Sequence, residues 1–299
     1  MYEELLASCQ LCPRRCGVNR LSGKTGFCGA GHEIKIARSA LHYWEEPPIS
    51  GKNGSGAVFF SYCPLQCVYC QNYEISTLYH GKTVTTAELT DIFLDLQAQG
   101  ALNINLVTPT HYVPQIITAL SAAKSAGLRI PIVYNCGGYE SLDTLRLLEG
   151  WIDIYLPDMK YFSDKHAAKY SGASRYFEHA SAAIAEMVRQ TGPPVLDENG
   201  VMRRGVIVRH MLLPGQLFDS KKIIDYLYET YHNDIYISIM NQYTPLPHTE
   251  KYPELCRPVS ERYYSAIVDY AASIGVENAF IQEGGTVDES FIPEFYYDE

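Results

Sequence analysis

Short apolar segments alternate with longer amphipathic segments along most of this 299-residue chain. The apolar segments have the length of strands and carry apolar residues on both faces, a pattern typical of buried parallel strands. These predicted strands cover 57–62, 103–107, 130–135, 152–156, 205–213, 235–240 and 279–282.

The segments between them have helical spacing of apolar residues, and Thr85 or Thr86 is a candidate cap for the first of them. The predicted helices cover 86–99, 113–126, 141–149, 174–190, 219–230 and 259–273. Strands that alternate with helices predict an α/β fold with a parallel sheet and helical crossovers. A complete eight-unit barrel is an alternative, but it has more units than this pattern provides.

The first 54 residues differ from the rest, because cysteines and glycines replace the strand–helix alternation. Residues 33–38 alternate like a short exposed strand. Pro47, Pro48 and the glycines of 51–56 then interrupt the pattern, which predicts a boundary. We therefore expect an N-terminal four-cysteine unit over 1–54 and a barrel domain over 55–299.

Charge and cysteine content narrow the class of protein. The chain has 24 Lys and Arg against 34 Asp and Glu, a net charge of −10, which argues against nucleic-acid binding. Seven of the nine cysteines fall in two tight groups, which favours metal binding over disulfides. No signal peptide or membrane-spanning segment is evident, so the sequence predicts a soluble cytoplasmic protein. The basic residues near 14–24 are interpreted as solvated loop charge, and Cys136 and Cys256 as buried structural thiols.

Two cysteine groups carry the candidate chemistry. Cys63, Cys67 and Cys70 form a Cys-x3-Cys-x2-Cys pattern directly after a predicted strand. Three thiolates would leave one iron of a cubane cluster without a protein ligand, and an open metal position is typical of a reactive site. A structural zinc loop is the alternative, but zinc prefers four ligands, and the next candidate, His80, lies ten residues on.

The second group has the pattern Cys-x2-Cys-x3-Cys-x11-Cys among glycine-rich turns. Four thiolates at this spacing fit either zinc or an iron–sulfur cluster, and the sequence leaves both open. The predicted ligands are Cys9, Cys12, Cys16 and Cys28.

Polar residues follow the other predicted strands. In parallel α/β barrels the chemistry lies at the carboxyl ends of the strands, so these side chains are expected to meet there. Asp158 and Lys160 are also able simply to pair with each other. The residues at these ends include Thr108, Asn135, Asp158, Lys160, Arg209 and Asn241.

The motif Tyr62-Cys63 through Cys67-Val68-Tyr69-Cys70-Gln71-Asn72 resembles that of the radical S-adenosylmethionine (SAM) enzymes. The resemblance implies a partial (β/α)6 barrel in which the three cysteines hold a [4Fe–4S] cluster whose open iron chelates SAM. It also implies that Tyr69 packs against the adenine, and that a one-electron donor such as flavodoxin or ferredoxin reduces the cluster under anaerobic conditions. The cofactor-binding residues implied are Tyr69, Gln71, Thr108, Asn135, Asp158, Lys160, Arg209 and Asn241.

Within that superfamily, Asp158-Met159-Lys160 and the strand from Arg209 to Pro214-Gly215 are similar to the activating enzymes of glycyl-radical enzymes such as pyruvate formate-lyase. The N-terminal unit is similar to a branch of activase-like proteins that begin with four cysteines. Two positions differ: Thr108-Pro109-Thr110 replaces the activases' Gly-Gly-Glu, and Asn135 replaces an aspartate that helps to bind a monovalent cation.

Three functions are therefore considered. The first is an activase that abstracts hydrogen from a glycine of a partner protein. The second is a radical enzyme that modifies another peptide or a small molecule. The third is a non-catalytic iron–sulfur or zinc protein.

Overall fold

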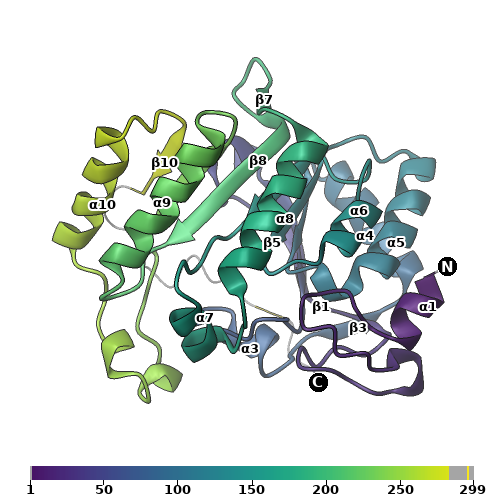
Figure 1. Cartoon of the computed structure of the whole chain (residues 1–299). Helices are drawn as coiled ribbons and strands as arrows, with labels where there is room; N and C mark the ends of the chain where they lie inside the picture. The colour runs from purple at the N-terminus through teal and green to yellow at the C-terminus, as the bar shows by residue number, and fades with distance from the viewer. Residues whose placement is uncertain (1, 283–294, 296–299) are drawn as a thin grey trace.

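Seven parallel strands form the centre of the computed structural model, which describes residues 2–282 and 295. Each strand hydrogen-bonds to the next one along the chain, so the order never reverses as it does in a doubly wound sheet. The strands are β2 (Ser55–Phe60), β4 (Ile104–Val107), β5 (Ile132–Cys136), β6 (Ile154–Pro157), β8 (Met202–Met211), β9 (Tyr236–Met240) and β10 (Ala279–Ile281). All seven predicted strands and the partial barrel are thus confirmed (Figure 1).

Helices follow the strands and cover the outside of the sheet (Figure 1). Thr85 caps the first of these helices, since its side chain accepts from the backbone of Glu88 while the Glu88 carboxylate accepts from the backbone of Thr85. The helices are α4 (Thr86–Ala98), α5 (Val113–Ala126), α6 (Leu142–Leu147), α7 (Asp164–Ser171), α8 (Tyr176–Thr191), α9 (Leu217–Tyr231) and α10 (Glu261–Ser273).

Two antiparallel strands extend the sheet beyond β2. β1 (Ile34–His42) pairs with β2 and with β3 (Lys82–Val84). The strand predicted over 33–38 is present in β1, but it is longer than predicted and is not exposed, because Ile34 and Ile36 are buried against the helices of the barrel. The sheet thus continues across the boundary expected between 1–54 and 55–299, whose status as a domain boundary stays a prediction.

Short elements and loops complete the described chain. A small hairpin joins β7 (Val195–Leu196) to β8. The short helices are α1 (Tyr2–Ala7), α2 (Pro47–Ser50) and α3 (Tyr73–Ser76), and single 3-10 turns span Arg20–Ser22, Thr110–Tyr112, Pro247–Thr249 and Pro253–Leu255.

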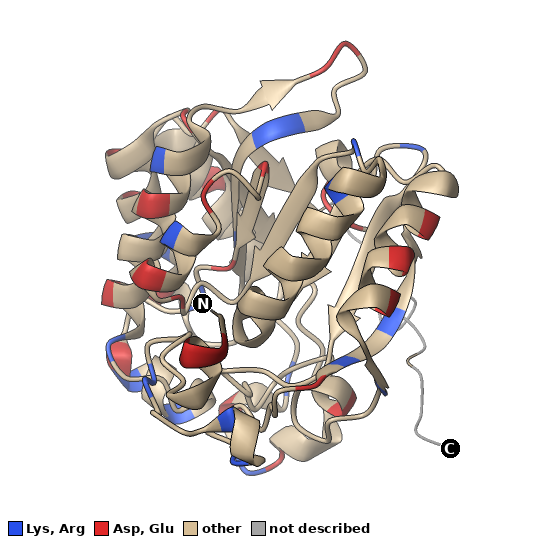
Figure 2. Cartoon of the chain, turned by 90° about the vertical axis from the view of Figure 1, so that its right-hand side faces the viewer, with Lys and Arg blue, Asp and Glu red and all other residues tan. Residues whose placement is uncertain are grey.

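The position of the N-terminal segment and the distribution of charged side chains can be followed in the two overall views (Figures 1 and 2). The N-terminal segment lies at the end of the barrel to which the arrow of β8 points, the carboxyl end of the strands (Figure 1). Lys and Arg are interspersed with Asp and Glu along the helices in the side view (Figure 2). In the part of the chain that the structure describes, no helix combines the length and apolarity needed to cross a membrane.

Candidate active site

The loop of Cys63, Cys67 and Cys70 begins where β2 ends. Tyr62 and Gln66 adopt positive φ angles of 73° and 47°, so the chain turns sharply on both sides of the first cysteine. Two donors already point at sulfur atoms: the backbone N–H of Leu65 lies 3.4 Å from Cys63 Sγ, and Ser171 Oγ lies 2.9 Å from Cys67 Sγ.

Cys63 and Cys70 need a positive partner to ionise. Burial, together with the charges of Cys67 and Cys70, raises the pKa of Cys63 to about 12. Burial also raises the pKa of Cys70. A bound metal cluster supplies the positive charge that turns such thiols into thiolates.

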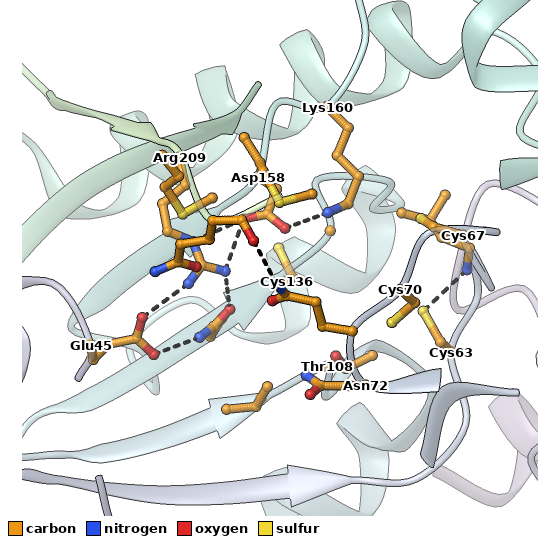
Figure 3. Close-up of a pocket in the computed structure, with 18 of the residues that line it drawn as sticks. Glu45, Cys63, Cys67, Cys70, Asn72, Thr108, Cys136, Asp158, Lys160 and Arg209 are labelled. Atoms are coloured by element: carbon orange, nitrogen blue, oxygen red, sulfur yellow. Dashed lines mark hydrogen bonds and ion pairs between the residues drawn. The ribbon is translucent and has the colours of Figure 1, made fainter. Parts of the chain in front are cut away.

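A buried ion network lies across the site from the cysteines (Figure 3). Asp158 accepts from Lys160 Nζ at 2.6 Å and from Arg209 Nε at 2.8 Å. Burial alone would raise the pKa of Asp158, but the charges of Arg209 and Lys160 outweigh it and lower that pKa. Burial alone would likewise lower the pKa of Lys160, whereas Asp158 raises it above the usual range, so both groups stay charged.

Asn135 and Glu45 extend this network. Arg209 donates to Asn135 Oδ1 at 2.7 Å and to Glu45 Oε1 at 3.0 Å, and Asn135 Nδ2 donates to Glu45 Oε2 at 3.1 Å. Asn105 Nδ2 donates to the same carboxylate oxygen at 2.8 Å. Arg209 therefore joins Asp158 at the end of β6 to Glu45, which lies between β1 and α2.

Most of the predicted site residues line a cavity at this end of the barrel. A cavity of about 360 Å³ separates the cysteine loop from the ion network. Of the predicted SAM-binding residues in the described chain, only Asn241 is absent from its walls. Its backbone N–H instead donates to Gln282 Oε1 at 2.8 Å. The predicted residues that line it are Cys63, Cys67, Cys70, Tyr69, Gln71, Thr108, Asn135, Asp158, Lys160 and Arg209.

Three of these residues have distinctive surroundings. Tyr69 is buried among tyrosine rings, and its hydroxyl accepts from Tyr161 at 2.7 Å. Gln71 Nε2 donates to the backbone of Gln242 at 2.6 Å, which ties the cysteine loop to the end of β9. Thr108 has a φ of 58°, a conformation that costs a β-branched residue energy and that turns the chain sharply after β4.

Sequence reasoning missed three acidic residues of the cavity. Burial raises the pKa of Glu46 to about 7, and its carboxylate accepts from Ser238 Oγ at 2.7 Å. Burial also raises the pKa of Glu140 to about 7, despite bonds from Thr110 Oγ1 and the Tyr134 hydroxyl. Glu45 is the third. For Glu45 and Glu46, the only sequence signal was that they form an acidic pair directly before Pro47-Pro48.

The four N-terminal cysteines lie within electrostatic range of one another. Burial raises the pKa of Cys12 to about 12 and also raises that of Cys28, with the other N-terminal thiols adding to both shifts. Cys16 is exposed. Within residues 2–282 and 295, no three His, Cys, Asp or Glu side chains stand close enough together to hold a metal ion as they are placed.

Two simple sequence interpretations were wrong. Arg20 is not solvated loop charge: only 1% of it is exposed, and its guanidinium donates to the carbonyls of Gly31 and His111. Cys256 is exposed, whereas Cys136 is buried as expected and also lines the cavity.

Comparison with protein families matches residues 57–227 to the radical SAM superfamily. The chain belongs to the radical SAM superfamily. This result confirms the resemblance inferred from the cysteine motif at the level of the superfamily. Radical SAM enzymes use SAM and a [4Fe–4S] cluster, which accounts for a three-cysteine loop beside a charged cavity.

The chain is also similar to one further protein in sequence and to solved structures of another protein in fold. The uncharacterized protein MJ0674 of Methanocaldococcus jannaschii is 28% identical over 265 residues, which span 85% of this chain and 71% of that protein. SuiB of Streptococcus suis has a TM-score of 0.50 at 15% identity over 75% of this chain, and SuiB bound to SAM has 0.51 at 14% over 74%. SuiB bound to the precursor peptide SuiA gives 0.50 at 14% identity over 74%. This chain spans about half the length of SuiB, and a likeness at this identity shows a shared fold.

The residues present fit the cluster that the superfamily implies. Sulfur-directed hydrogen bonds, such as those from Leu65 N and Ser171 Oγ, are a recognised feature of iron–sulfur ligands. Cys63, Cys67 and Cys70 would hold the cluster at the wall of the cavity.

Proposed function

We propose that this radical SAM enzyme abstracts hydrogen from a peptide or protein and so modifies it. The cavity between Cys63–Cys70 and the Asp158–Arg209 network carries the proposal, since it offers one wall for a cluster and an opposite wall of fixed charges. When bound and reduced, the cluster supplies one electron that cleaves SAM to methionine and a 5′-deoxyadenosyl radical.

The protein's own side chains orient SAM for that cleavage. In the described chain Lys160 Nζ donates to Asp158, which leaves two of its three N–H donors for a SAM carboxylate. Arg209 donates to Asp158, Asn135 and Glu45 at once, so its role is to hold Asp158 in place at the cavity wall. The Thr108 hydroxyl takes the place of the activases' Gly-Gly-Glu in recognition of the SAM amino group.

A peptide substrate is favoured by fold similarity to SuiB, whose structure has been solved with its precursor peptide. The experiment uses anaerobically reconstituted, reduced enzyme with SAM and a heat-cleared cell extract divided by ultrafiltration. We expect the macromolecular fraction to raise 5′-deoxyadenosine formation, and we expect proteinase treatment of that fraction to remove the effect. Stimulation by the low-molecular-weight fraction alone that survives proteinase treatment would contradict the proposal.

Activation of a glycyl-radical enzyme is the second candidate. It is favoured by the match of Tyr69–Asn72 and of Asp158-Met159-Lys160 to the activases. An α-deuterated glycine in the partner protein should then transfer deuterium to 5′-deoxyadenosine, which mass spectrometry detects. Cleavage of SAM without deuterium transfer would exclude this candidate for the partner tested.

A further inference from the structure

The four N-terminal cysteines are fastened directly to the loop that carries the three radical cysteines. Arg14 lies two residues after Cys12, and its Nε donates at 2.6 Å to the carbonyl of Pro64, the residue after Cys63. Its Nη2 donates at 3.0 Å to the carbonyl of Ser171. Ser171 is also the residue whose hydroxyl donates to Cys67 Sγ.

A second hydrogen bond also joins the two groups, but its donor belongs to the radical cysteine loop and its acceptor to the N-terminal segment. Gln66, the neighbour of Cys67, donates from Nε2 at 3.0 Å to the carbonyl of Phe27, the neighbour of Cys28. The guanidinium of Arg14 stacks on the Phe27 ring at 3.4 Å from its centroid. Residues adjacent to cysteines of both groups are therefore in direct contact.

Arg14 places one positive charge between the two groups. Its side chain lies within electrostatic range of Cys12, Cys28 and Cys63 at once. Adding an electron to an iron–sulfur cluster makes it more negative, and nearby positive charge and hydrogen bonds to sulfur favour the reduced form. A cation in this position favours the arrival of an electron on either side of it.

The N-terminal group also has an outward face. Cys16 is exposed, and the side chains of Leu21 and Phe27, which lie in the segment between Cys16 and Cys28, are 44% and 45% exposed. One side of the group is thus open to a partner protein, while the other side contacts the radical cysteine loop.

We propose that Cys9, Cys12, Cys16 and Cys28 hold a second iron–sulfur cluster that relays single electrons from a donor protein to the cluster held by Cys63, Cys67 and Cys70. In each transfer the donor loses one electron, the N-terminal cluster gains it and then returns to its oxidised state, and no covalent bond changes. Four thiolates complete the ligand set of such a cluster. The relay rests on the proposed radical function, but the existence of the second cluster does not.

The first experiment tests the cluster alone. The full chain with Cys63→Ala, Cys67→Ala and Cys70→Ala is reconstituted anaerobically and analysed for iron, sulfide and zinc, then reduced for electron paramagnetic resonance. We expect about four irons and about four sulfides per chain and a signal that appears on reduction. Adding Cys12→Ser and Cys28→Ser should remove both. Bound zinc without iron, or no metal at all, would overturn the proposal whether or not the wild type cleaves SAM.

The second experiment tests the relay. With the radical cysteines intact, the Arg14→Gln variant should retain the iron of both clusters and lose about tenfold in 5′-deoxyadenosine formation driven by reduced flavodoxin. Its rate with dithionite, a small reductant that reaches the radical cluster directly, should fall much less than the flavodoxin-driven rate, because that electron does not pass through the N-terminal group. The Cys12→Ser and Cys28→Ser double variant should show the same difference between the flavodoxin-driven and the dithionite-driven rates. Cys256→Ser serves as the control, because Cys256 is exposed and outside both groups. Equal losses with both reductants, or no loss with flavodoxin, would overturn the relay.

Discussion

The two cysteine groups contain similar thiols but are built in different ways. The radical group follows β2, and the barrel itself brings Asp158, Lys160 and Arg209 to face it. The N-terminal group has no strand beneath it and is held by side chains, chiefly Arg14. The comparison teaches that backbone architecture positions the reactive site, whereas a few long polar side chains attach the second group to it.

The largest expected effect is the loss of stability when the buried ion network is broken, which we compare with the loss when exposed ion pairs are broken. Asp158→Ala leaves Lys160 and Arg209 buried without their shared carboxylate, so we expect the free energy of unfolding to fall by about 3–5 kcal/mol. Asp143→Ala removes the exposed pairs with Arg15 and Arg146 and should cost less than about 1 kcal/mol. Urea denaturation measures both. Equal costs for the two variants would contradict the distinction.

Glu140, which lines the cavity, makes the stability of the protein depend on pH. Its carboxyl is buried, and its pKa is raised to about 7 from the ordinary 4.5, so the folded state holds a proton that the unfolded state has lost between these values. Stability therefore falls as pH rises from 4.5 to 7 and is level above that. The cost in stability is about 3 kcal/mol, since one pKa unit corresponds to about 1.4 kcal/mol.

Glu140→Gln should remove the fall in stability that Glu140 causes between pH 4.5 and 7. Denaturation of wild type and variant at several pH values measures the difference between their slopes. Parallel stability curves across this range would show that the Glu140 carboxyl does not titrate there. His210, whose pKa burial lowers, remains present in both proteins and cancels in the comparison.

Arg14→Lys tests the attachment of the N-terminal group. Lysine keeps the charge but loses the guanidinium bonds to Pro64, Ser171 and Gly172, so we expect a loss of about 1–2 kcal/mol. Limited proteolysis should cleave the first 54 residues faster than in wild type. Arg15→Lys is the matched control, since the Arg15 side chain is 59% exposed and, among the residues that the structure describes, forms an ion pair only with Asp143. Similar proteolysis of both variants would contradict the anchoring role of Arg14.

Ser171→Ala should have the smallest effect. It removes the hydrogen bond to Cys67 Sγ and the one shared with the Tyr161 hydroxyl, at a cost of about 1 kcal/mol. Because the bond to Cys67 Sγ favours the more negative, reduced state, its loss should shift the reduction potential of the radical cluster to a more negative value. A spectroelectrochemical titration checks the sign, and a shift to a more positive value would contradict it.

The sequence was sufficient for the strands, most helices and the radical cysteine motif, because apolar periodicity and ligand spacing are local signals. Contacts between distant segments were not predictable in this way. Glu45 meets Arg209 across 164 residues, and Ser171 meets Cys67 across 104. β1 was misjudged as exposed because its polar residues are partly covered by the neighbouring strands rather than fully solvated. The roles of the residues that line the cavity stay predictions.

The most direct test of the radical assignment is the anaerobic formation of 5′-deoxyadenosine from SAM by the reconstituted, dithionite-reduced enzyme. The account predicts product with wild-type protein and none above background with Cys67→Ala, while that variant still carries the N-terminal cluster. Equal product formation by wild type and Cys67→Ala would contradict the assignment of Cys63, Cys67 and Cys70 as the reactive site.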